Sequence, residues 1–209
     1  MVPIGDALLF KEVSSAFLNI GGFCNVCFVE DPIQAFDVCP GNLPLNSLAS
    51  KLGYAFDRDG HLAANAELNQ DLLKKLNSLP FYSLPAPKSL GTEWLDSCFY
   101  PLLHGEIPAE VQLRTVCEHI AIQIANKLNE KGHSSVLVTG GGAKNRFLIK
   151  RLRTHFNGEL LLPEVELIDF KEALIFGFLG ALYLAGQNNC LAAVTGAKRD
   201  VKGGVLHLP

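Results

Sequence analysis

The chain has 209 residues, a length that suits one large domain or one lobe of a two-lobed enzyme. Hydrophobic residues make up 48% of it and charged residues 19%, so it can bury a core and is not disordered. The formal net charge of -3 argues against a nucleic-acid-binding protein. The six cysteines follow no pattern of a disulfide scaffold, which favours a reducing compartment.

No segment predicts export or a membrane span. Residues 1–6 contain neither a basic nor an apolar region of a signal peptide. The longest apolar run, residues 173–186, contains three glycines and is shorter than the ~20 residues that cross a bilayer. We therefore expect a soluble, cytoplasmic protein without a membrane partner.

Three short strands are predicted near the start of the chain, over residues 16–20, 25–29 and 34–38. Turn signals separate them, first Gly21-Gly22 and then Glu30-Asp31-Pro32. Because the connections are so short, we expect an antiparallel meander.

The middle of the chain, residues 57–106, is the least regular part and contains four prolines. It predicts one short helix, over residues 68–76. We interpret the segment as an insertion that faces the substrate cleft.

The rest of the chain predicts alternating helices and strands. A helix over about 108–130 carries apolar residues at spacings of three and four, and a strand follows at 136–138. An amphipathic helix through 148–156, a strand at 160–162 and a mostly buried helix over 172–185 complete the pattern. The order predicts an α/β fold: a ribonuclease-H-like lobe, as in actin-like ATPases, with a mixed sheet and helices on both faces.

Two early motifs carry polar groups at strand ends. Asn19-Ile20-Gly21-Gly22 lets backbone amides approach a phosphate, although an ordinary hairpin turn explains it too. Asp37 ends an apolar strand just before Pro40-Gly41. A carboxylate there can accept a proton in a cleft, or it can cap the turn.

A third motif, VTGGGAKN over residues 138–145, lies between a predicted strand and a predicted helix. Its three glycines leave the helix N-terminus open for a nucleotide, whereas a tight turn needs only one. A dinucleotide-binding fingerprint would want glycine at position 145, where Asn145 stands.

Other chemistry has little support. Cys24 and Cys27 have redox-type spacing but lie in a predicted strand, and no second pair accompanies them. The histidines form no ligand pattern, so no protein metal site is predicted. A ribonuclease-H-like nuclease needs several carboxylates around two metals, and Asp37 is the one well-placed candidate on the early strands.

Seven segments in one order resemble the anhydro-N-acetylmuramic acid kinases, members of the actin–hexokinase superfamily. The segments are LNIGG (18–22), FD with PGN (36–42), YAFDRDG (54–60), PKSLGTE (87–93), VTGGGAKN (138–145), EAL (172–174) and VTGA (194–197). The resemblance runs across essentially the whole chain and covers the C-terminal part of a typical member. It implies that residues 1–209 form a single C-terminal lobe of a two-lobed sugar kinase.

The resemblance implies a reaction in peptidoglycan recycling. The family opens 1,6-anhydro-N-acetylmuramic acid with water and phosphorylates its 6-oxygen from ATP, with Mg²⁺ bridging the ATP phosphates. The implied roles make Asp37 the catalytic base that activates the water. The implied ATP-binding residues are Asn19, Gly21, Gly22, Gly140, Gly141, Gly142 and Asn145. The implied contacts to the amino sugar are Lys88, Ser89, Gly91 and Glu93.

Two departures from the family pattern matter. Many members have Thr-Gly where this chain has Val38-Cys39. Members also begin with a hydroxyl-rich Gly-Thr-Ser loop that binds ATP phosphates, and residues 1–15 contain no such loop. We therefore expect an N-terminal lobe as a necessary partner, and little activity without it.

These departures leave an alternative open, a non-catalytic binding or assembly module that retains the kinase fold. We also expect the lobe to expose an apolar face and to form a homodimer through it.

Overall fold

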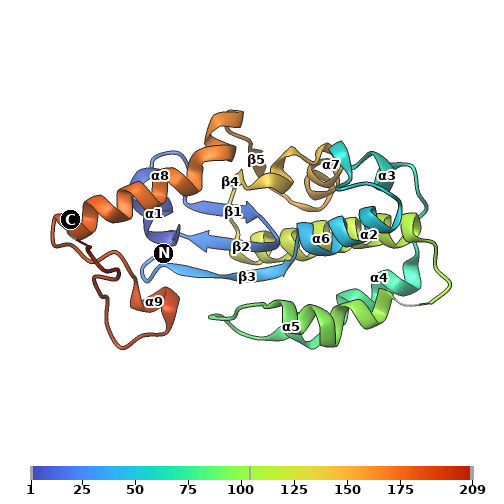
Figure 1. The fold of residues 1–209 in the computed structure, drawn as a ribbon, viewed down its shortest axis with the longest axis horizontal. Coiled ribbons are helices and arrows are strands. Elements are labelled where there is room, and N and C mark those ends of the chain that lie inside the picture. Colours follow the sequence, from blue (N-terminus) through green and yellow to red (C-terminus); the bar gives the residue numbers. More distant parts are fainter. Residues whose placement is uncertain (1, 104, 208–209) are drawn as a thin grey trace.

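A five-stranded mixed sheet organises the computed structural model, which describes residues 2–103 and 105–207 (Figure 1). The strands are β1 (Ala16–Ile20), β2 (Phe23–Phe28), β3 (Gln34–Pro40), β4 (Ser135–Thr139) and β5 (Glu159–Leu161). Their order across the sheet is β3-β2-β1-β4-β5.

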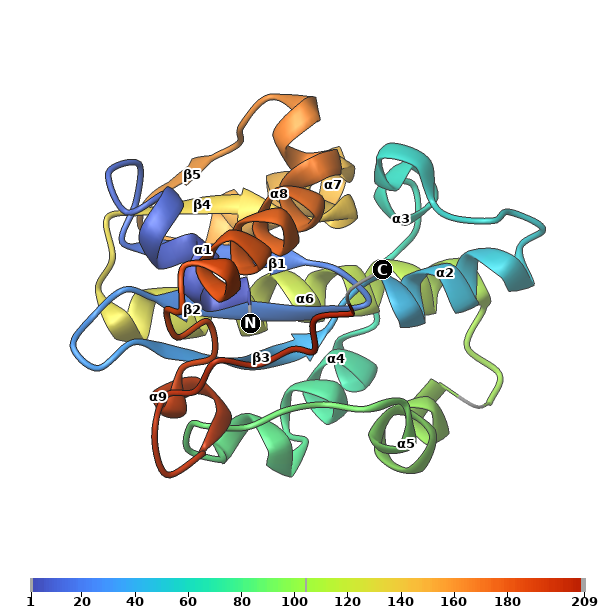
Figure 2. The same ribbon diagram turned by 60° about the vertical axis from the view of Figure 1, so that its left-hand side comes forward.

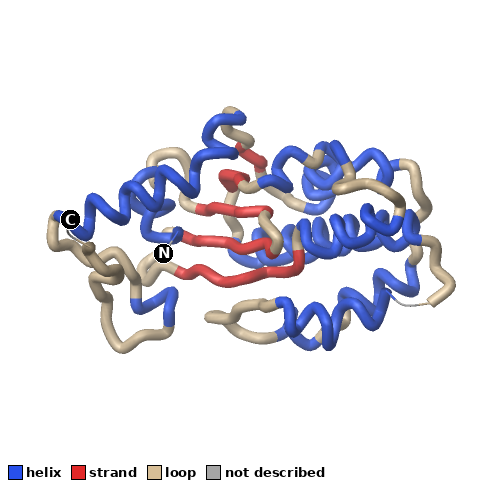
Figure 3. Tube along the Cα trace, viewed as in Figure 1, coloured by secondary structure: helices blue, strands red, loops and turns tan. Residues whose placement is uncertain are grey.

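The strand directions confirm the predicted meander. β2 pairs antiparallel with both β1 and β3, across the short turns that the sequence indicates. β4 runs parallel to β1, and β5 runs parallel to β4. Figure 3 shows the strands in red among the helices in blue. Parallel neighbours need long crossovers, and helices supply them here.

The main hydrophobic core lies between one face of the sheet and a layer of helices (Figure 2). Its centre is α6 (Ala109–Lys131), whose apolar stripe is fully buried as the spacing predicts. Around it pack α2 (Asn42–Lys51), α4 (Gln70–Asn77) and α7 (Arg146–His155).

Two helices, α1 (Val2–Leu9) and α8 (Val165–Leu184), lie on the opposite face of the sheet (Figure 2). Smaller apolar clusters hold them there, one of them built on Phe17, Cys27 and Leu137. The predicted mixed sheet with helices on both faces is thus confirmed.

The prediction that the last long helix is mostly buried is wrong. α8 buries only Lys171, Ile175, Leu179 and Leu182, because one side alone of the helix meets α1 and the sheet. Its other side exposes large apolar residues, namely Val165, Phe170, Leu174, Phe176 and Leu184. None of the helices among the described residues has the length and apolar character needed to cross a membrane.

The middle of the chain is more helical than predicted. Besides α4, its described residues form α3 (His61–Ala64), α5 (Thr92–Trp94), three 3-10 helical turns and a π-helical turn over Leu95–Phe99. α1 and α2 were also not predicted from the sequence; α2 carries Pro44 in its first turn, where a helix tolerates proline. A last short helix, α9 (Ala192–Thr195), follows α8.

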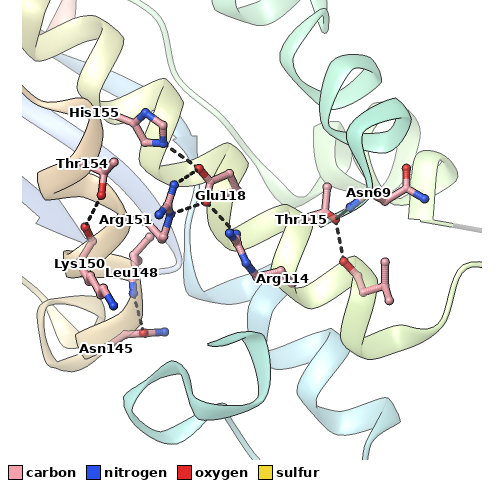
Figure 4. A network of polar contacts seen from close by, with 11 residues as sticks. Asn69, Arg114, Thr115, Glu118, Asn145, Leu148, Lys150, Arg151, Thr154 and His155 are labelled. Carbon is pink, nitrogen blue, oxygen red and sulfur yellow. Dashed lines mark hydrogen bonds and ion pairs between the residues drawn. The ribbon is translucent and has the colours of Figure 1, made fainter. Parts of the chain in front are cut away.

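A buried carboxylate ties α6 to α7 (Figure 4). Glu118 accepts hydrogen bonds from Arg114 at 2.7 Å, from Arg151 at 2.7 and 2.8 Å, and from His155 at 2.7 Å. Burial by itself raises the pKa of Glu118, but these hydrogen bonds outweigh it and lower the pKa to about 2. The network holds α7, and with it the glycine turn that precedes α7.

Candidate active site

A row of polar side chains crosses four adjacent strands. Asn19 on β1 is paired with Thr139 on β4 and with Asn25 on β2, and Asn25 is paired with Asp37 on β3. Three interstrand spacings make the row about 14 Å long.

The row lies on the face of the sheet that carries α1 and α8. Side chains two residues apart on a strand share a face, and Phe17, Cys27 and Leu137 precede or follow members of the row by two residues. Those three residues form the small core on this face. The polar row therefore borders that core, with Asn19, Asn25 and Asp37 partly exposed and Thr139 buried.

A cavity of about 700 Å³ covers the row. All four polar residues line it, together with residues from the two glycine turns and from α8. The turn residues are Gly21, Gly140 and Gly141, and the α8 residues include Asp169, Lys171 and Glu172. The structure thus brings together the predicted base and both predicted glycine turns.

Asp37 is half-buried and held at its backbone and its side chain. Its N–H donates to the Lys88 carbonyl at 3.1 Å, and its Oδ2 accepts from the Leu90 N–H at 2.8 Å. Among the described residues no donor meets its Oδ1. Burial raises the pKa of Asp37, while the Leu90 amide opposes the rise. A carboxylate with a raised pKa and a free oxygen in a cavity is equipped to accept a proton.

A bulge beside Asp37 explains its orientation. Cys24 pairs with Cys39 and Asn25 with Asp37, so Val38 is the extra residue in β3. Val38 and Cys39 are both buried in the main core and neither lines the cavity. The departure from the family's Thr-Gly at these two positions therefore places no side chain in the cavity.

The surroundings that a side chain would meet differ among the three glycines between β4 and α7. Gly140 has φ of 84°, and a Cβ there would lie 2.6 Å from Asn19 Oδ1. A Cβ on Gly142 would overlap the Ile20 side chain. Gly141 is exposed, and its nearest neighbour would be Asn42 Nδ2 at 3.7 Å. Two glycines thus allow the turn to approach β1, and the third leaves free space beside it.

A second cavity of about 470 Å³ lies beyond the glycine turn. Gly141 lines both cavities, whereas Gly142 and Asn145 line only the second. Asn145 also caps α7, since its side chain accepts from the Leu148 N–H at 3.0 Å. Gly22 lines neither cavity and packs against Leu43.

The second cavity includes residues to which the sequence assigned no role. Phe56, Arg58 and Asp59 line it opposite the glycine turn, and Phe56 is half exposed, with the Arg58 guanidinium 5.7 Å from its ring centre. An aromatic ring beside a cation in an open cavity offers a surface on which a flat ring can stack.

The four residues predicted to contact sugar divide into two pairs. Lys88 and Ser89 line the larger cavity, but the Lys88 ammonium donates to the Phe81 carbonyl at 2.9 Å. Burial lowers the pKa of Lys88. Gly91 and Glu93 stand at the start of α5, outside the described cavities, with the Glu93 carboxylate folded over Gly91.

The sequence indicated some site residues and missed others. Asn25, Thr139 and Lys171 line the cavity without having been assigned to it. The signal for Asn25 and Thr139 was present, since each is a polar residue within or at the end of an otherwise apolar strand. What the sequence did not show was the register that aligns them with Asp37.

Cysteines and metal ligands add no further centre within residues 2–103 and 105–207. No group of three or more histidine, cysteine or carboxylate side chains there is close enough to hold a metal ion. The cysteines are free thiols, and Cys24 and Cys27 are buried in the sheet.

The architecture is an α/β fold of the actin-like ATPase type. A solved structure with a similar fold is the activator of the 2-hydroxyisocaproyl-CoA dehydratase from Clostridium difficile with bound ADPNP. The similarity has a TM-score of 0.52 at 16% identity, over 78% of this chain and 57% of that one. At that identity the likeness concerns the fold alone.

The chain belongs to the anhydro-N-acetylmuramic acid kinase family, whose sequence model matches residues 1–208. A family member from Vibrio parahaemolyticus is 31% identical over 99% of this chain and 60% of its own length. One from Pseudomonas syringae pv. tomato is 35% identical, over 98% and 60% respectively. One from a Sulfurovum species is 32% identical, over 97% and 58%. The chain thus spans about 60% of the length of these relatives.

Proposed function

We propose that this chain is the part of an ATP-dependent kinase that binds nucleotide and carries the catalytic base. The substrate would be 1,6-anhydro-N-acetylmuramic acid, as the names of the relatives indicate. The observation that carries the proposal is the single cavity shared by Asp37 and the two glycine turns.

In this proposal Asp37 takes a proton from water. The water oxygen forms a bond to C1 of the sugar while the bond from C1 to O6 breaks. O6 then accepts the terminal phosphoryl group of ATP, ADP leaves, and the water proton remains on Asp37. The raised pKa of Asp37 favours its part in this step, because a more basic carboxylate is a better proton acceptor.

In this proposal the two cavities hold different parts of the nucleotide. Phosphates would lie in the larger cavity beside the Asn19 side chain and along Gly140 and Gly141, where backbone amides can supply donors. The Gly21 amide already donates to the Phe23 carbonyl at 3.1 Å, so Gly21 would contribute close approach and not a donor. The nucleoside would lie in the second cavity, between Asn145 and the ring of Phe56.

Mg²⁺ is the expected companion of the phosphates, and it usually takes one or two carboxylates with phosphate oxygens and water. Asp169 and Glu172 line the larger cavity as possible carboxylates, with Asp169 also paired to Lys144. The donor set is compatible with an ion held chiefly by ATP. When bound, the ion would neutralise charge on the transferring phosphoryl group.

The sugar would enter on the β3 side of the larger cavity, beside Asp37, Lys88 and Ser89. Gly91 and Glu93 would reach it through a movement of the 88–93 segment, which is tied to β3 through Lys88 and Leu90.

We further propose that the rest of the kinase covers this cavity in the whole enzyme. About 40% of each relative's length lies outside the match. The exposed apolar side of α8 is the surface through which we expect this chain to form a homodimer when it is studied by itself.

Calorimetric titration of the chain with ADP tests the nucleotide proposal. Wild-type protein should bind ADP, and Gly141→Val should fold normally yet bind about tenfold or more weakly, since the new side chain would fill space between the two cavities. Gly177→Val is the matched control, because Gly177 lies on α8 with open space around it and lines neither cavity. Absence of ADP binding by the wild-type chain, or equal binding by Gly141→Val, would contradict the proposal.

A further inference from the structure

A buried ammonium lies where three walls of the larger cavity meet. Lys171 Nζ is 2.6 Å from Asp6 Oδ1 and 3.1 Å from Thr139 Oγ1. The side chains of Lys171 and Asp6 are only 7% and 5% exposed. Lys171 belongs to α8, Asp6 to α1 and Thr139 to the end of β4, so one charge joins all three elements.

A gain in the free energy of unfolding does not explain why Lys171 and Asp6 form an ion pair at this site. Its surroundings are apolar, with the rings of Phe17 and Phe10 centred 5.7 and 6.0 Å from Lys171 Nζ. Removing two charges from water costs about as much as their attraction returns, so a well-packed apolar pair would serve such a site equally well. An ammonium differs from an apolar side chain in having directed hydrogen-bond donors.

The residues of this ion pair and its Thr139 partner are adjacent or close in sequence to residues that line the larger cavity. Thr139 directly precedes Gly140, the glycine with positive φ that begins the turn. Val2 and Pro3, a few residues before Asp6 on α1, line the cavity, and so does Glu172, which follows Lys171.

We propose that Lys171, held by Asp6, is a positioning residue that fixes the start of the phosphate-binding glycine turn through the Thr139 hydroxyl. The Thr139 side chain borders the cavity but is fully buried, so its hydroxyl acts on the glycine turn through the backbone at the end of β4 and not by contact with a ligand. The expected effect on nucleotide binding rests on the proposed function, whereas the ordering of the turn does not.

Hydrogen exchange in the ligand-free protein tests the ordering directly. The turn is held by hydrogen bonds from Ala143 N–H to the Gly140 carbonyl and from Asn145 N–H to the Gly142 carbonyl, both 3.0 Å long. In Lys171→Met and in Thr139→Val we expect these two amides to exchange about tenfold faster than in wild type. Lys150→Met, which changes an exposed lysine on α7, should leave both rates unchanged.

The double variant Asp6→Leu with Lys171→Met separates positioning from packing. It replaces the ion pair by apolar residues, so its Tm should return to near the wild-type value, whereas Asp6→Asn strands a buried charge and should lower Tm by roughly 10 °C. We expect the double variant to retain fast exchange at Ala143 and Asn145 and to bind ADP about tenfold more weakly.

If the double variant has the wild-type Tm and also the wild-type exchange rates at Ala143 and Asn145, the inference is overturned. The ion pair would then do nothing that an apolar pair cannot do. If the Asp6 and Lys171 variants do not fold, Thr139→Val decides, and unchanged exchange in it would overturn the inference equally. Failure of the wild-type chain to bind ADP would refute the proposed function and leave the exchange result to decide this one.

Discussion

The orientation of the Asp37 carboxylate depends on its neighbours in the fold. Because of the bulge at Val38, the side chains of Val38 and Cys39 both lie in the main core. The Leu90 amide donates to one carboxylate oxygen of Asp37. The other oxygen stays available toward the cavity. Sequence alone identified Asp37 as a strand-end carboxylate but left open whether it caps a turn. The register of β3 against β2 is long-range information that no local pattern contains.

Gly140 carries a prediction at the same scale. Gly140→Ala should destabilise the protein by roughly 2–4 kcal/mol, because alanine is strained at φ of 84° and its Cβ would lie 2.6 Å from Asn19 Oδ1. Gly132→Ala is a control for positive φ, since Gly132 has φ of 71° and ψ of 19°, in the left-handed helical region, with open space around it, whereas Gly140 has ψ of 164°. The control should lose only about 1–2 kcal/mol in urea unfolding. Equal losses in the two variants would show that neither the close approach to β1 nor the extended ψ of Gly140 adds to the cost.

At the scale of the element, the strands and α6 were predicted well, whereas the short helices, and the start of α8 at Val165 instead of residue 172, were not. β1, β3, β4 and α6 carry strong periodic patterns with clear turn residues at their ends. α1 and α2 are short and contain proline near their starts, so packing rather than intrinsic propensity determines them. The burial of α8 was predicted wrongly for a different reason. Apolar composition shows that a helix can be buried, but it does not show which sides of the helix have neighbours.

The Glu118 network predicts how the joint between α6 and α7 responds to acid. The pKa of Glu118 is about 2 in the fold, against an ordinary value of 4.5, so its stabilisation is fully present above pH 4.5 and is lost as the pH falls toward 2. Glu118→Gln should therefore cost roughly 3 kcal/mol at pH 7, and the difference from wild type should shrink below pH 4.5.

Urea unfolding at several pH values measures this difference. Glu130→Gln is the control, because the Glu130 side chain is exposed and surface pairs such as the one it forms with Lys127 contribute about 0.5 kcal/mol. A Glu118→Gln difference that stays constant from pH 7 to pH 3 would refute the role given to the carboxylate charge.

At the scale of the whole molecule, the sheet has helices on both faces, but α8 has one side uncovered. Phe170, Leu174 and Phe176 are each about half exposed or more. We predict concentration-dependent self-association, seen by analytical ultracentrifugation as a mass that rises from monomer to dimer.

Leu174→Lys should shift that equilibrium to monomer without lowering Tm, since its side chain is 48% exposed already. Val205→Lys, at an exposed apolar position outside α8, should leave the dimer intact. A wild-type chain that stays monomeric at high concentration would contradict the role given to this face.

The central claim is that Asp37 activates water in a cavity that also binds nucleotide. Its most direct test joins this chain to the part of the Vibrio parahaemolyticus relative that lies outside the match and measures phosphorylation of 1,6-anhydro-N-acetylmuramic acid by ATP. In the active chimera, Asp37→Asn should lower kcat by about 10²-fold or more while the Kd for ADP stays within about twofold of its starting value. Sugar phosphorylation by Asp37→Asn at the unaltered rate would contradict the account.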